Sequence, residues 1–503
     1  MTAAARAPGR PAEPVVERVE ALAGLVVGGD VMVPVAGAAG RTARCFANLD
    51  HAASTPPFWR VLAAVNEAAR WYANVHRGAG FKSCLTTWAY EQARAAVLRF
   101  TGADPAHAVA LFTRNTTEAL NLLAARLAVP AGAVVLVTEM EHHSNDLPWR
   151  RAAPGRVVHV RVLADGRVDE ADLLAKLRRF HGRVAVLAAS GASNVTGLVN
   201  PVHRWARWAH EAGALIVVDA AQLAPHRPID VRPPGDPAHL DFVAFSAHKL
   251  YAPFGAGALV GSARLLAEGE PYQAGGGTVD SVGLDSVAWT ALPDREEAGT
   301  PPVLGALALA AAIAEIERVG WPRIEAHERA LAARLLARLA SVPGLAILGP
   351  GADARHDRVG VVAFDVAGVP HGLVAAVLAA EWGIGTRSGC FCAHPYVKRL
   401  LDLSPGAIAA YEARVAAGDR GDLPGAVRAS LGLGSTAEDV DRLGDALLAV
   451  AAGRYRAGYA CDPAHGTWHH PEDLACFETW LRADGALGDA LGRARTGTPA
   501  WLA

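Results

Sequence analysis

Short apolar runs alternate with helical stretches along the middle of this chain, and this alternation constrains the possible fold more than any other feature. Each run is five or six residues long, which suits a strand that is buried on both faces of a sheet. Strands that alternate with helices pair in a mostly parallel sheet, so the sequence predicts an α/β fold. The runs span 109–113, 133–138, 184–189, 215–219, 241–245 and 257–261.

Polar residues follow directly after several of these runs. The carboxyl ends of parallel strands meet at one edge of an open α/β sheet, where such folds bind their ligands. We therefore expect an active site at this edge. The polar clusters are Glu141-His142-His143, Ser193-Asn194, Asp219-Ala220-Ala221-Gln222 and Ser246-Ala247-His248-Lys249.

The composition is that of an ordinary globular protein, with 51% hydrophobic and 19% charged residues. The net charge is −2 and no basic block is present, so nucleic-acid binding has no electrostatic support. The apolar stretches at 21–40 and 305–314 are interrupted by a charge or too short to span a bilayer. Six cysteines are too few for a disulfide scaffold in 503 residues. We expect a cytoplasmic protein with reduced thiols and no membrane partner.

Lys249 and Asp219 are the first candidates for functional residues. Lys249 follows the apolar run DFVAFSAH, and Asp219 closes the run LIVVD, so both side chains are expected at strand ends. Most lysines are surface charges, and an Asp at this place can also cap the next helix, so neither residue decides the function alone. A buried carboxylate needs a partner, and a protonated ring nitrogen would be a suitable one.

A helix start rich in hydroxyl groups adds to this set. Thr116 and Thr117 open a helix after the run ALFTRN, where side-chain hydroxyls and free backbone N–H groups can bind phosphate, although an ordinary N-cap would look the same. Ser246 and His248 flank the lysine, and His142 could lie over a ring. Pyridoxal phosphate (PLP) needs such a lysine, carboxylate, phosphate cradle and stacking group. PLP is therefore the expected cofactor.

In their order along the chain, these segments resemble the class V aminotransferase-fold enzymes, specifically the SUF-type branch of cysteine desulfurases and selenocysteine lyases. The resemblance runs from about residue 48 to about residue 447. It implies PLP-dependent transferase fold type I, with a large domain on a mostly parallel seven-stranded sheet and a smaller α+β C-terminal domain. The matching motifs are NLDHAAST (48–55), NVHRG (74–78), SCLTTWAYEQAR (83–94), TRNTTEALN (113–121), EMEHHSNDLPW (139–149), SNVTGLVNPV (193–202), VVDAAQLAPH (217–226), DFVAFSAHKLYAPFGAGALVG (241–261), GGGTV (275–279), EAGTPP (297–302) and RSGCFCAHP (387–395).

The sequence also predicts individual elements at both ends of the chain and four segments overall. A short helix is expected around 14–27. In the small domain we expect a strand at 358–365, a helix at 370–382 and a return at 384–390. The expected segments are an N-terminal extension (1–44), a large PLP-binding domain (45–315), a small domain that carries a cysteine loop (316–455) and a C-terminal extension (456–503).

The resemblance implies roles for the residues that match each motif. Lys249 would form the Schiff base with PLP, Asp219 would keep the ring nitrogen protonated, and Gln222 would bind the ring hydroxyl. His142 would stack on the ring. The residues implied to hold the phosphate are Thr116, Thr117, Ser246 and His248.

A small amino acid is the implied substrate. Asn194 and Arg428 match residues that hold it, and the fork of an arginine suits its carboxylate better than a lysine would. His76 and Arg387 belong to the same expected substrate-binding set. Thr300, in EAGTP, would reach the phosphate of the neighbouring subunit, which implies a homodimer.

A cysteine loop carries the expected chemistry. In the resembled family, the cysteine of an Arg-x-Gly-x-x-Cys loop attacks the substrate sulfur and becomes a persulfide. Here the loop starts at Arg387 and places Cys392 at the nucleophile's position. A nearby arginine and an exposed loop favour the required thiolate, although most cysteines are buried and inert. The resemblance implies removal of sulfur from L-cysteine, or of selenium from selenocysteine, with alanine as product and a sulfur-acceptor protein as a further partner.

The loop also departs from the SUF-type pattern. Its Gly-Cys-Phe-Cys sequence resembles the desulfurase domain of molybdenum-cofactor sulfurases, so Cys390 could resolve a persulfide, receive its sulfur or have no role. Asn115 replaces an expected glycine. About 20 extra residues, near 402–423, lie between Cys392 and Arg428 and could reshape access to the loop.

Other readings stay open on the sequence alone. A PLP-dependent C–S lyase or epimerase would need Lys249 but no thiol, and a sulfur-carrier protein would turn over only with its partner. In the tail, a cap with surface histidines is preferred over a zinc site, because the spacing matches no standard zinc pattern. The tail residues concerned are Cys461, His465, His469, His470 and Cys476.

Overall fold

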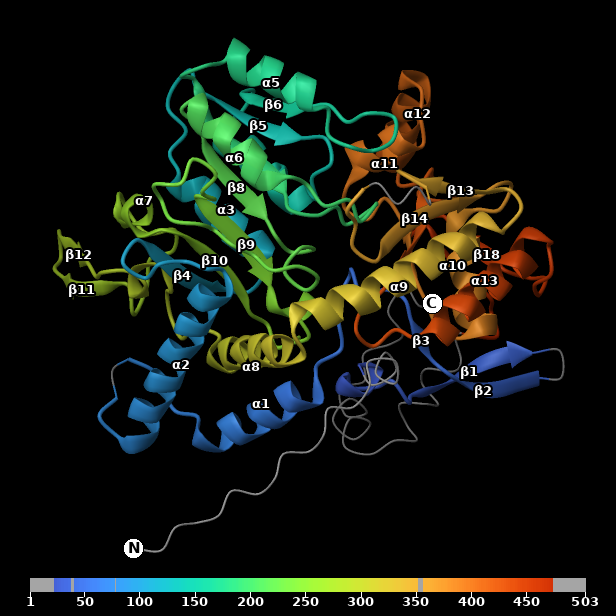
Figure 1. Ribbon diagram of the computed structural model, residues 1–503, viewed down its shortest axis with the longest axis horizontal. Coiled ribbons are helices and arrows are strands. Elements are labelled where there is room, and N and C mark those ends of the chain that lie inside the picture. Colours follow the sequence, from blue (N-terminus) through green and yellow to red (C-terminus); the bar gives the residue numbers. More distant parts are fainter. Residues whose placement is uncertain (1–21, 38–39, 77, 352–355, 474–503) are drawn as a thin grey trace, which may run out of the picture.

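A computed structural model describes residues 22–37, 40–76, 78–351 and 356–473 of the chain. Its centre is a seven-stranded sheet with the strand order β4-β10-β9-β8-β7-β5-β6 (Figure 1). Strands β5 to β9 pair in parallel, and β10 runs antiparallel to both of its neighbours. The strands are β4 (Ala108–Thr113), β5 (Val134–Thr138), β6 (Val157–Val160), β7 (Val184–Ser190), β8 (Leu215–Asp219), β9 (Phe242–Ser246) and β10 (Gly257–Ser262).

This sheet confirms the predicted α/β fold and its mostly parallel seven-stranded sheet. Each of the six apolar runs forms a strand whose ends lie within one residue of the predicted ones. The edge strand β6 was not predicted, because its residues are mostly half-buried and form no continuous apolar run.

Alternate strand residues enter two different cores, because side chains of a strand point to opposite faces. On one face, Leu111 and Val217 pack with α3 and α4. On the other face, Phe112 and Val218 pack with helices that include α2, α6 and α8. The helices of this part are α1 (Trp59–Trp71), α2 (Phe81–Phe100), α3 (Thr116–Arg126), α4 (Leu147–Ala152), α5 (Glu170–Arg179), α6 (Val202–Glu211), α7 (Ala263–Ala267) and α8 (Val303–Val319).

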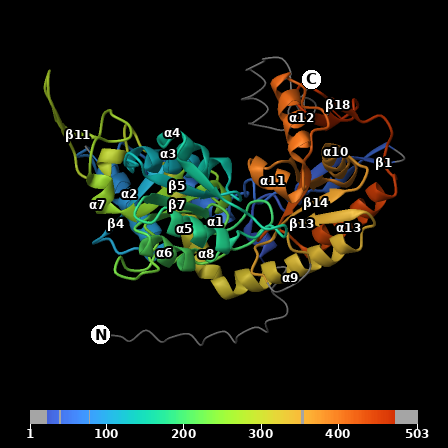
Figure 2. The same ribbon diagram turned by 90° about the horizontal axis from the view of Figure 1, so that it is seen from above.

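The long helix α9 (Trp321–Ala340) leads from α8 to a second, smaller sheet (Figures 1 and 2). This sheet is antiparallel, with the order β13-β14-β17-β16, and has its own core against α9, α10 and α13. The predicted strand, helix and return of this unit are present, although the domain boundaries stay a prediction. The elements are β13 (Leu345–Leu348), β14 (Val361–Val366), α10 (His371–Trp382), β16 (Arg387–Gly389), β17 (Ala426–Ser430) and α13 (Ala437–Ala451).

The chain before the large sheet also joins the smaller unit. Strand β3 (Ala47–Asn48) pairs in parallel with β15 (Ile384–Gly385), next to the cysteine loop. The hairpin of β1 (Met32–Gly37) and β2 (Gly40–Cys45) packs against α10. Of the short helix expected around 14–27, residues 14–21 lie outside the described part, and the rest contains a single 3-10 turn at Ala23–Leu25.

The extra residues near 402–423 contain a helix, α12 (Pro405–Ala416), which follows α11 (His394–Leu400). In the tail, the hairpin of β18 (Ala460–Asp462) and β19 (Thr467–His469) packs on α10. Among the described residues, no group of three or more His, Cys, Asp or Glu is arranged to hold a metal, and Cys476 lies outside them.

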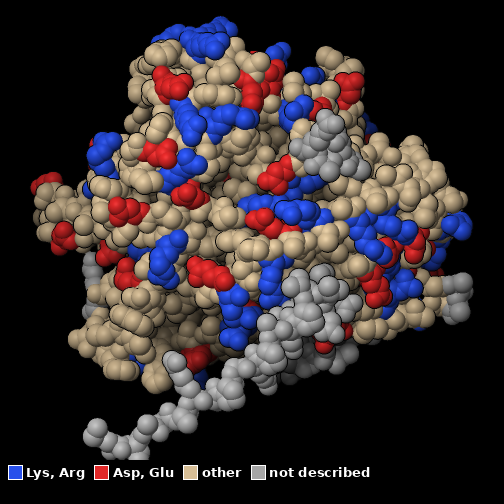
Figure 3. Space-filling model, in the orientation of Figure 1, with Lys and Arg blue, Asp and Glu red and all other residues tan. Residues whose placement is uncertain are grey.

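The surface carries charges of both signs. Lysine and arginine side chains are interspersed with aspartate and glutamate over the face drawn in Figure 3. No helix within the described ranges has the length and apolar character needed to cross a bilayer.

Candidate active site

A cavity lies at the carboxyl ends of the central strands, where the sequence predicts the active site. It encloses about 840 Å³ of empty space, part of which is open to solvent. Residues from both sheets line it. The predicted residues among them are Thr116, Thr117, His142, Asn194, Asp219, Gln222, Ser246, His248, Lys249, Arg387, Cys392 and Arg428.

Lys249 ends a 3-10 turn that follows directly after β9. Burial lowers the pKa of its amine to about 8, and Asp219 partly opposes this shift. Arg428 lowers the pKa further through its positive charge. A lysine with this pKa is partly neutral near neutral pH, which is the form that reacts with a carbonyl group.

Asp219 lies at the end of β8 and is only 5% exposed. Burial raises the pKa of its carboxyl group, while the N–H of Ala221, which donates to Oδ1 at 2.9 Å, lowers it. Within the described parts of the chain, no side chain donates a hydrogen bond to this carboxylate. A buried carboxylate that accepts no hydrogen bond from a side chain can pair with a cationic N–H group of a ligand.

Gln222 offers a second unmet hydrogen-bonding group. Its Nε2 donates to the carbonyl of Ala52 at 2.7 Å, whereas its Oε1 is buried and has no partner among the described residues. Buried polar groups are rarely left unpaired in proteins. Because Gln222 lines the cavity, a ligand hydroxyl would satisfy this oxygen.

The start of α3 brings several hydroxyl groups together. The N–H of Thr116 donates to Ser246 Oγ at 2.8 Å, and the hydroxyls of these two residues are 2.6 Å apart. Thr117 Oγ1 lies 2.7 Å from Ser144 Oγ. Because the first N–H groups of a helix lack partners within it, this arrangement fits a phosphate. The lysine, carboxylate, unpaired amide oxygen and hydroxyls together fit PLP.

Asn115 shows why the expected glycine is not needed before this helix. Its φ is −173°, which is extended backbone that any residue can adopt. Its side chain caps α3 by accepting from the N–H of Glu118 at 3.0 Å. The asparagine therefore takes the N-cap position without backbone strain.

His142 is held in one tautomer. Its Nδ1 accepts a hydrogen bond from the N–H of Ser144 at 3.1 Å, so the neutral ring carries its proton on Nε2. Burial, followed by the charge of Lys249, lowers the pKa of His142 to about 3. The same two causes lower the pKa of His248 to about 4. Both rings are therefore neutral near neutral pH.

Arg428 enters the cavity from β17, and it is only 3% exposed. Its Nη2 donates to Asp50 Oδ1 at 2.8 Å, and its Nη1 donates to the carbonyl of Asn194 at 3.0 Å. Its Nε is buried without a partner among the described residues. A carboxylate in the cavity could share this guanidinium with Asp50. Asp50 lies in the motif NLDHAAST, but no role was predicted for it.

The cysteine loop forms a strained turn at the edge of the cavity. The N–H of Ala393 donates to the carbonyl of Cys390 at 2.8 Å, and the central residues Phe391 and Cys392 have φ values of 50° and 55°. These left-handed conformations each cost about 1 kcal/mol or more for residues other than glycine. The exposed Cys392 lines the cavity.

Two groups from the segments that follow β7 and β5 hold this turn in place. Asn194 Nδ2 donates to the carbonyl of Phe391 at 2.7 Å. The N–H of His143 donates to the carbonyl of Cys392 at 2.7 Å. The amide nitrogen of Asn194, which was expected to hold substrate, therefore positions the cysteine loop in this structure.

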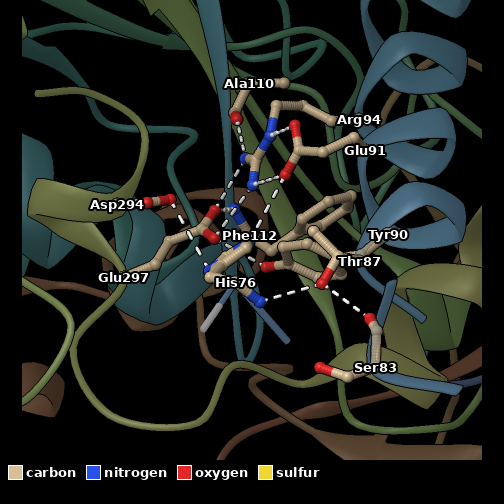
Figure 4. A network of polar contacts seen from close by, with 10 residues as sticks. All are labelled: His76, Ser83, Thr87, Tyr90, Glu91, Arg94, Ala110, Phe112, Asp294 and Glu297. Carbon is tan, nitrogen blue, oxygen red and sulfur yellow. Dashed lines mark hydrogen bonds and ion pairs between the residues drawn. The ribbon is translucent and has the colours of Figure 1, made fainter. Parts of the chain in front are cut away.

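Two predicted residues lie outside the cavity. His76 lies 3.6 Å from a carboxylate oxygen of Glu91 and 3.7 Å from one of Asp294 (Figure 4). The backbone N–H of His76 donates to Thr87 Oγ1 at 2.9 Å, and its ring contacts that of Tyr90, so His76 lies beside α2. Thr300 lines a separate cavity with Arg114, and its contact with a neighbouring subunit stays a prediction.

Glu141 is a buried residue to which the sequence assigned no role. Its carboxylate accepts hydrogen bonds from Thr138, from the N–H and hydroxyl of Ser190, and from Asn145. Burial raises the pKa of Glu141 to about 7, although these hydrogen bonds lower it. The carboxylate ties the ends of β5 and β7 together beside His142. In the sequence, Glu141 is the first residue of a polar cluster that follows a predicted strand, and this position could have pointed to such a role.

Comparisons with known proteins agree on one family. Residues 47–443 match the family model for aminotransferase class-V. A cysteine desulfurase of Dickeya dadantii is 37% identical over 379 residues, which is 74% of this chain and 84% of the relative. The apo structure of a cysteine desulfurase from Thermococcus onnurineus has a TM-score of 0.71 and 33% identity, covering 81% of this chain and 95% of that one. The Escherichia coli cysteine desulfurase CsdA, in an S-sulfonic acid form, has a TM-score of 0.68 and 32% identity, covering 82% and 96%.

Proposed function

This chain belongs to the class-V aminotransferase family, and we propose that it is a PLP-dependent cysteine desulfurase that takes the sulfur of L-cysteine onto Cys392 and releases L-alanine. One observation carries the proposal: Cys392 lines the same cavity as Lys249 and Asp219. The resemblance of the chain to cysteine desulfurases over most of their length supports it.

Different residues of the cavity would bind different parts of the cofactor. Asp219 would face the ring nitrogen and Gln222 Oε1 the ring hydroxyl, while His142 would lie against the ring. The phosphate would lie at the start of α3, among the hydroxyls of Thr116, Thr117 and Ser246 and near His248. When bound, PLP supplies an electron sink for bonds broken at the substrate's α-carbon.

The remaining groups would act on the substrate. Arg428 would bind the substrate carboxylate, and Arg387 adds positive charge at the mouth of the cavity. The neutral amine of Lys249 would take the α-proton and return a proton later. The Cys392 thiolate would attack the substrate sulfur, so that a sulfur–sulfur bond forms as the carbon–sulfur bond breaks. The electron pair of the broken bond stays with the substrate carbon, which is protonated to give alanine.

Product analysis with purified enzyme tests this function. Incubation with L-cysteine should give alanine, and mass spectrometry should find a persulfide at Cys392. The Cys392→Ala variant should lose persulfide formation while keeping bound PLP, and it can retain cleavage of selenocysteine because selenium is the better leaving group. Pyruvate and ammonia in place of alanine would identify a C–S lyase. Release of sulfide from L-cysteine at the wild-type rate by Cys392→Ala would refute the thiol mechanism.

The proposed enzyme acts as a homodimer in the cytoplasm and passes its sulfur to an acceptor protein. Two exposed apolar features support the dimer. Phe81 and Trp88 on α2 are 75% and 62% exposed, and Leu284, at the tip of the hairpin of β11 (Val279–Val282) and β12 (Val287–Trp289), is fully exposed. Exposed apolar patches of this kind mark protein interfaces. Thr300 would contribute to the partner's phosphate site.

A further inference from the structure

The loop that carries Cys392 holds a second thiol that the proposed mechanism does not use. Cys390 begins the turn in which Phe391 and Cys392 are the central residues. Adjacent α-carbons are about 3.8 Å apart, so the α-carbons of the two cysteines are at most about 7 Å apart. Two cysteines can exchange bonds to sulfur when their α-carbons are separated by roughly 4.4–6.8 Å. The charge of Cys392 also raises the pKa of Cys390, so the two thiols interact, and a rearrangement of this turn is the step that would bring the sulfurs into contact.

The two thiols have different surroundings. Cys392 is exposed and lines the cavity, whereas Cys390 is only 8% exposed and is not among the residues that line it. The S–H of Cys390 donates to the carbonyl of Pro424 at 3.6 Å. A sulfur atom held on Cys390 would be shielded from solvent and would leave the cavity free for the next substrate.

The extra helix α12 contributes to the surroundings of Cys390. Burial raises the pKa of this thiol, while a hydrogen bond from the Tyr411 hydroxyl of α12 and the charge of Lys398 lower it. The Lys398 ammonium also lies 4.3 Å from the centre of the Tyr411 ring, so a cation–π interaction links these two side chains. The segment that departs from the SUF-type pattern thus supplies a group that stabilises a negative sulfur.

We propose that Cys390 is a second sulfur carrier, which accepts the outer sulfur of the Cys392 persulfide and holds it beside Tyr411. This inference rests on the proposed persulfide at Cys392. The Cys390 sulfur attacks the outer sulfur, so that a bond to Cys390 forms and the bond to Cys392 breaks. The electron pair of the broken bond returns to the Cys392 sulfur, which takes up the proton that Cys390 loses. One sulfur atom moves between two thiols, and no oxidant or reductant is required.

Mass spectrometry can locate the sulfur within the loop. The holoenzyme is incubated with L-cysteine without an acceptor and is quenched with an alkylating agent at successive times. The peptide that contains both cysteines is then fragmented between them. We expect the sulfur at Cys392 first and at Cys390 later. In Cys390→Ser it should stay at Cys392, and in Tyr411→Phe its arrival at Cys390 should be slowed several-fold.

A second arm separates this inference from the proposed function. The Lys249→Ala variant is treated with inorganic polysulfide, which adds sulfur to exposed thiols without turnover. Cys390 should receive sulfur in this arm. It should receive none in the double variant that carries both Lys249→Ala and Cys392→Ser. If Cys390 receives sulfur from polysulfide in this way but the wild type forms no persulfide from L-cysteine, the proposed desulfurase function is rejected. The proposal that Cys390 is a second sulfur carrier then still stands. Cys461, a partly exposed thiol in the tail hairpin of β18 and β19, is the control for unspecific labelling in both arms.

Three results would overturn the proposal. The first is sulfur at Cys392 alone, at every time and in both arms. The second is labelling of Cys390 that does not depend on Cys392 or does not exceed that of Cys461. The third is a disulfide between the two loop cysteines with release of sulfide, because Cys390 would then have attacked the inner sulfur.

Discussion

At the scale of the residue, burial decides the chemistry of the cavity. The same removal from water lowers the pKa of Lys249, His142 and His248 and raises that of Asp219 and Glu141. In each case burial disfavours the charged form. The site therefore presents a partly neutral amine and two neutral imidazoles to a ligand that carries its own charges.

The pKa of about 8 predicts how Lys249 reacts with PLP. Only the neutral amine attacks an aldehyde, so attachment of PLP to the apoprotein should speed up by about tenfold per pH unit below this pKa and level off above it. Borohydride trapping and mass spectrometry at residue 249 measure the rate. Lys249→Arg, which keeps the positive charge, should show no attachment at any pH. A rate that still rises steeply above pH 9 would place the pKa near that of a free lysine.

Glu141 predicts a pH dependence of stability. Its pKa is raised from 4.5 to about 7 in the folded protein, so its contribution is fully present below pH 4.5 and is lost as the pH rises through 7. The loss is on the order of 3 kcal/mol at ~1.4 kcal/mol per pH unit. Glu141→Gln cannot ionise, so its unfolding free energy should change less between pH 5 and 7.5. Urea unfolding at several pH values measures this, and equal slopes in both proteins would contradict it.

At the scale of the element, the sequence predicted what depends on local pattern. The six apolar strands follow from uninterrupted hydrophobic runs, and the clusters at their ends follow from the parallel topology. The edge strand β6 lacks such a run, so only its pairing with β5 reveals it. The anchoring of the cysteine turn by Asn194 and His143 depends on contacts between distant segments, which no local pattern encodes.

This anchored turn makes Asn194 a positioning residue with a testable effect. Asn194→Ala removes the donor to the Phe391 carbonyl, so the strain of the two left-handed residues is no longer offset. We expect faster hydrogen exchange at residues 389–393, unchanged exchange in β8, and a lower kcat with L-cysteine. Asn194→Gln, which keeps a donor, should restore part of the protection. Wild-type exchange in the loop of Asn194→Ala would show that the turn is held by other contacts.

At the scale of the whole molecule, exposed apolar residues predict self-association. Leu284 stands fully exposed at a hairpin tip, next to Val282 and Val287, which are 64% and 48% exposed. The proposed homodimer should therefore be weakened by Leu284→Asp, and light scattering coupled to size-exclusion chromatography would show a shift toward monomer. Leu163→Asp, at another exposed leucine, is the control. If the wild-type protein is a monomer, the hairpin has no role in dimerisation.

The family resemblance carried the whole-molecule prediction further than pattern alone. The two-sheet arrangement was expected from ordered motifs, and the comparisons confirm the family. The place of His76 was not anticipated, because its two carboxylate neighbours come from segments more than 200 residues apart. The joining of the N-terminal hairpin to the small unit was missed for the same reason.

The pairing of β3 with β15 has a consequence for biosynthesis. Ala47 and Leu49 are synthesised early, yet both are fully buried in a core whose other buried members lie between residues 331 and 450. Until Ile384 and Gly385 have left the exit tunnel, β3 lacks the strand with which it pairs, and large proteins that are only partly folded are exposed to aggregation. Chaperones that shield nascent chains would therefore act before the cysteine loop is translated.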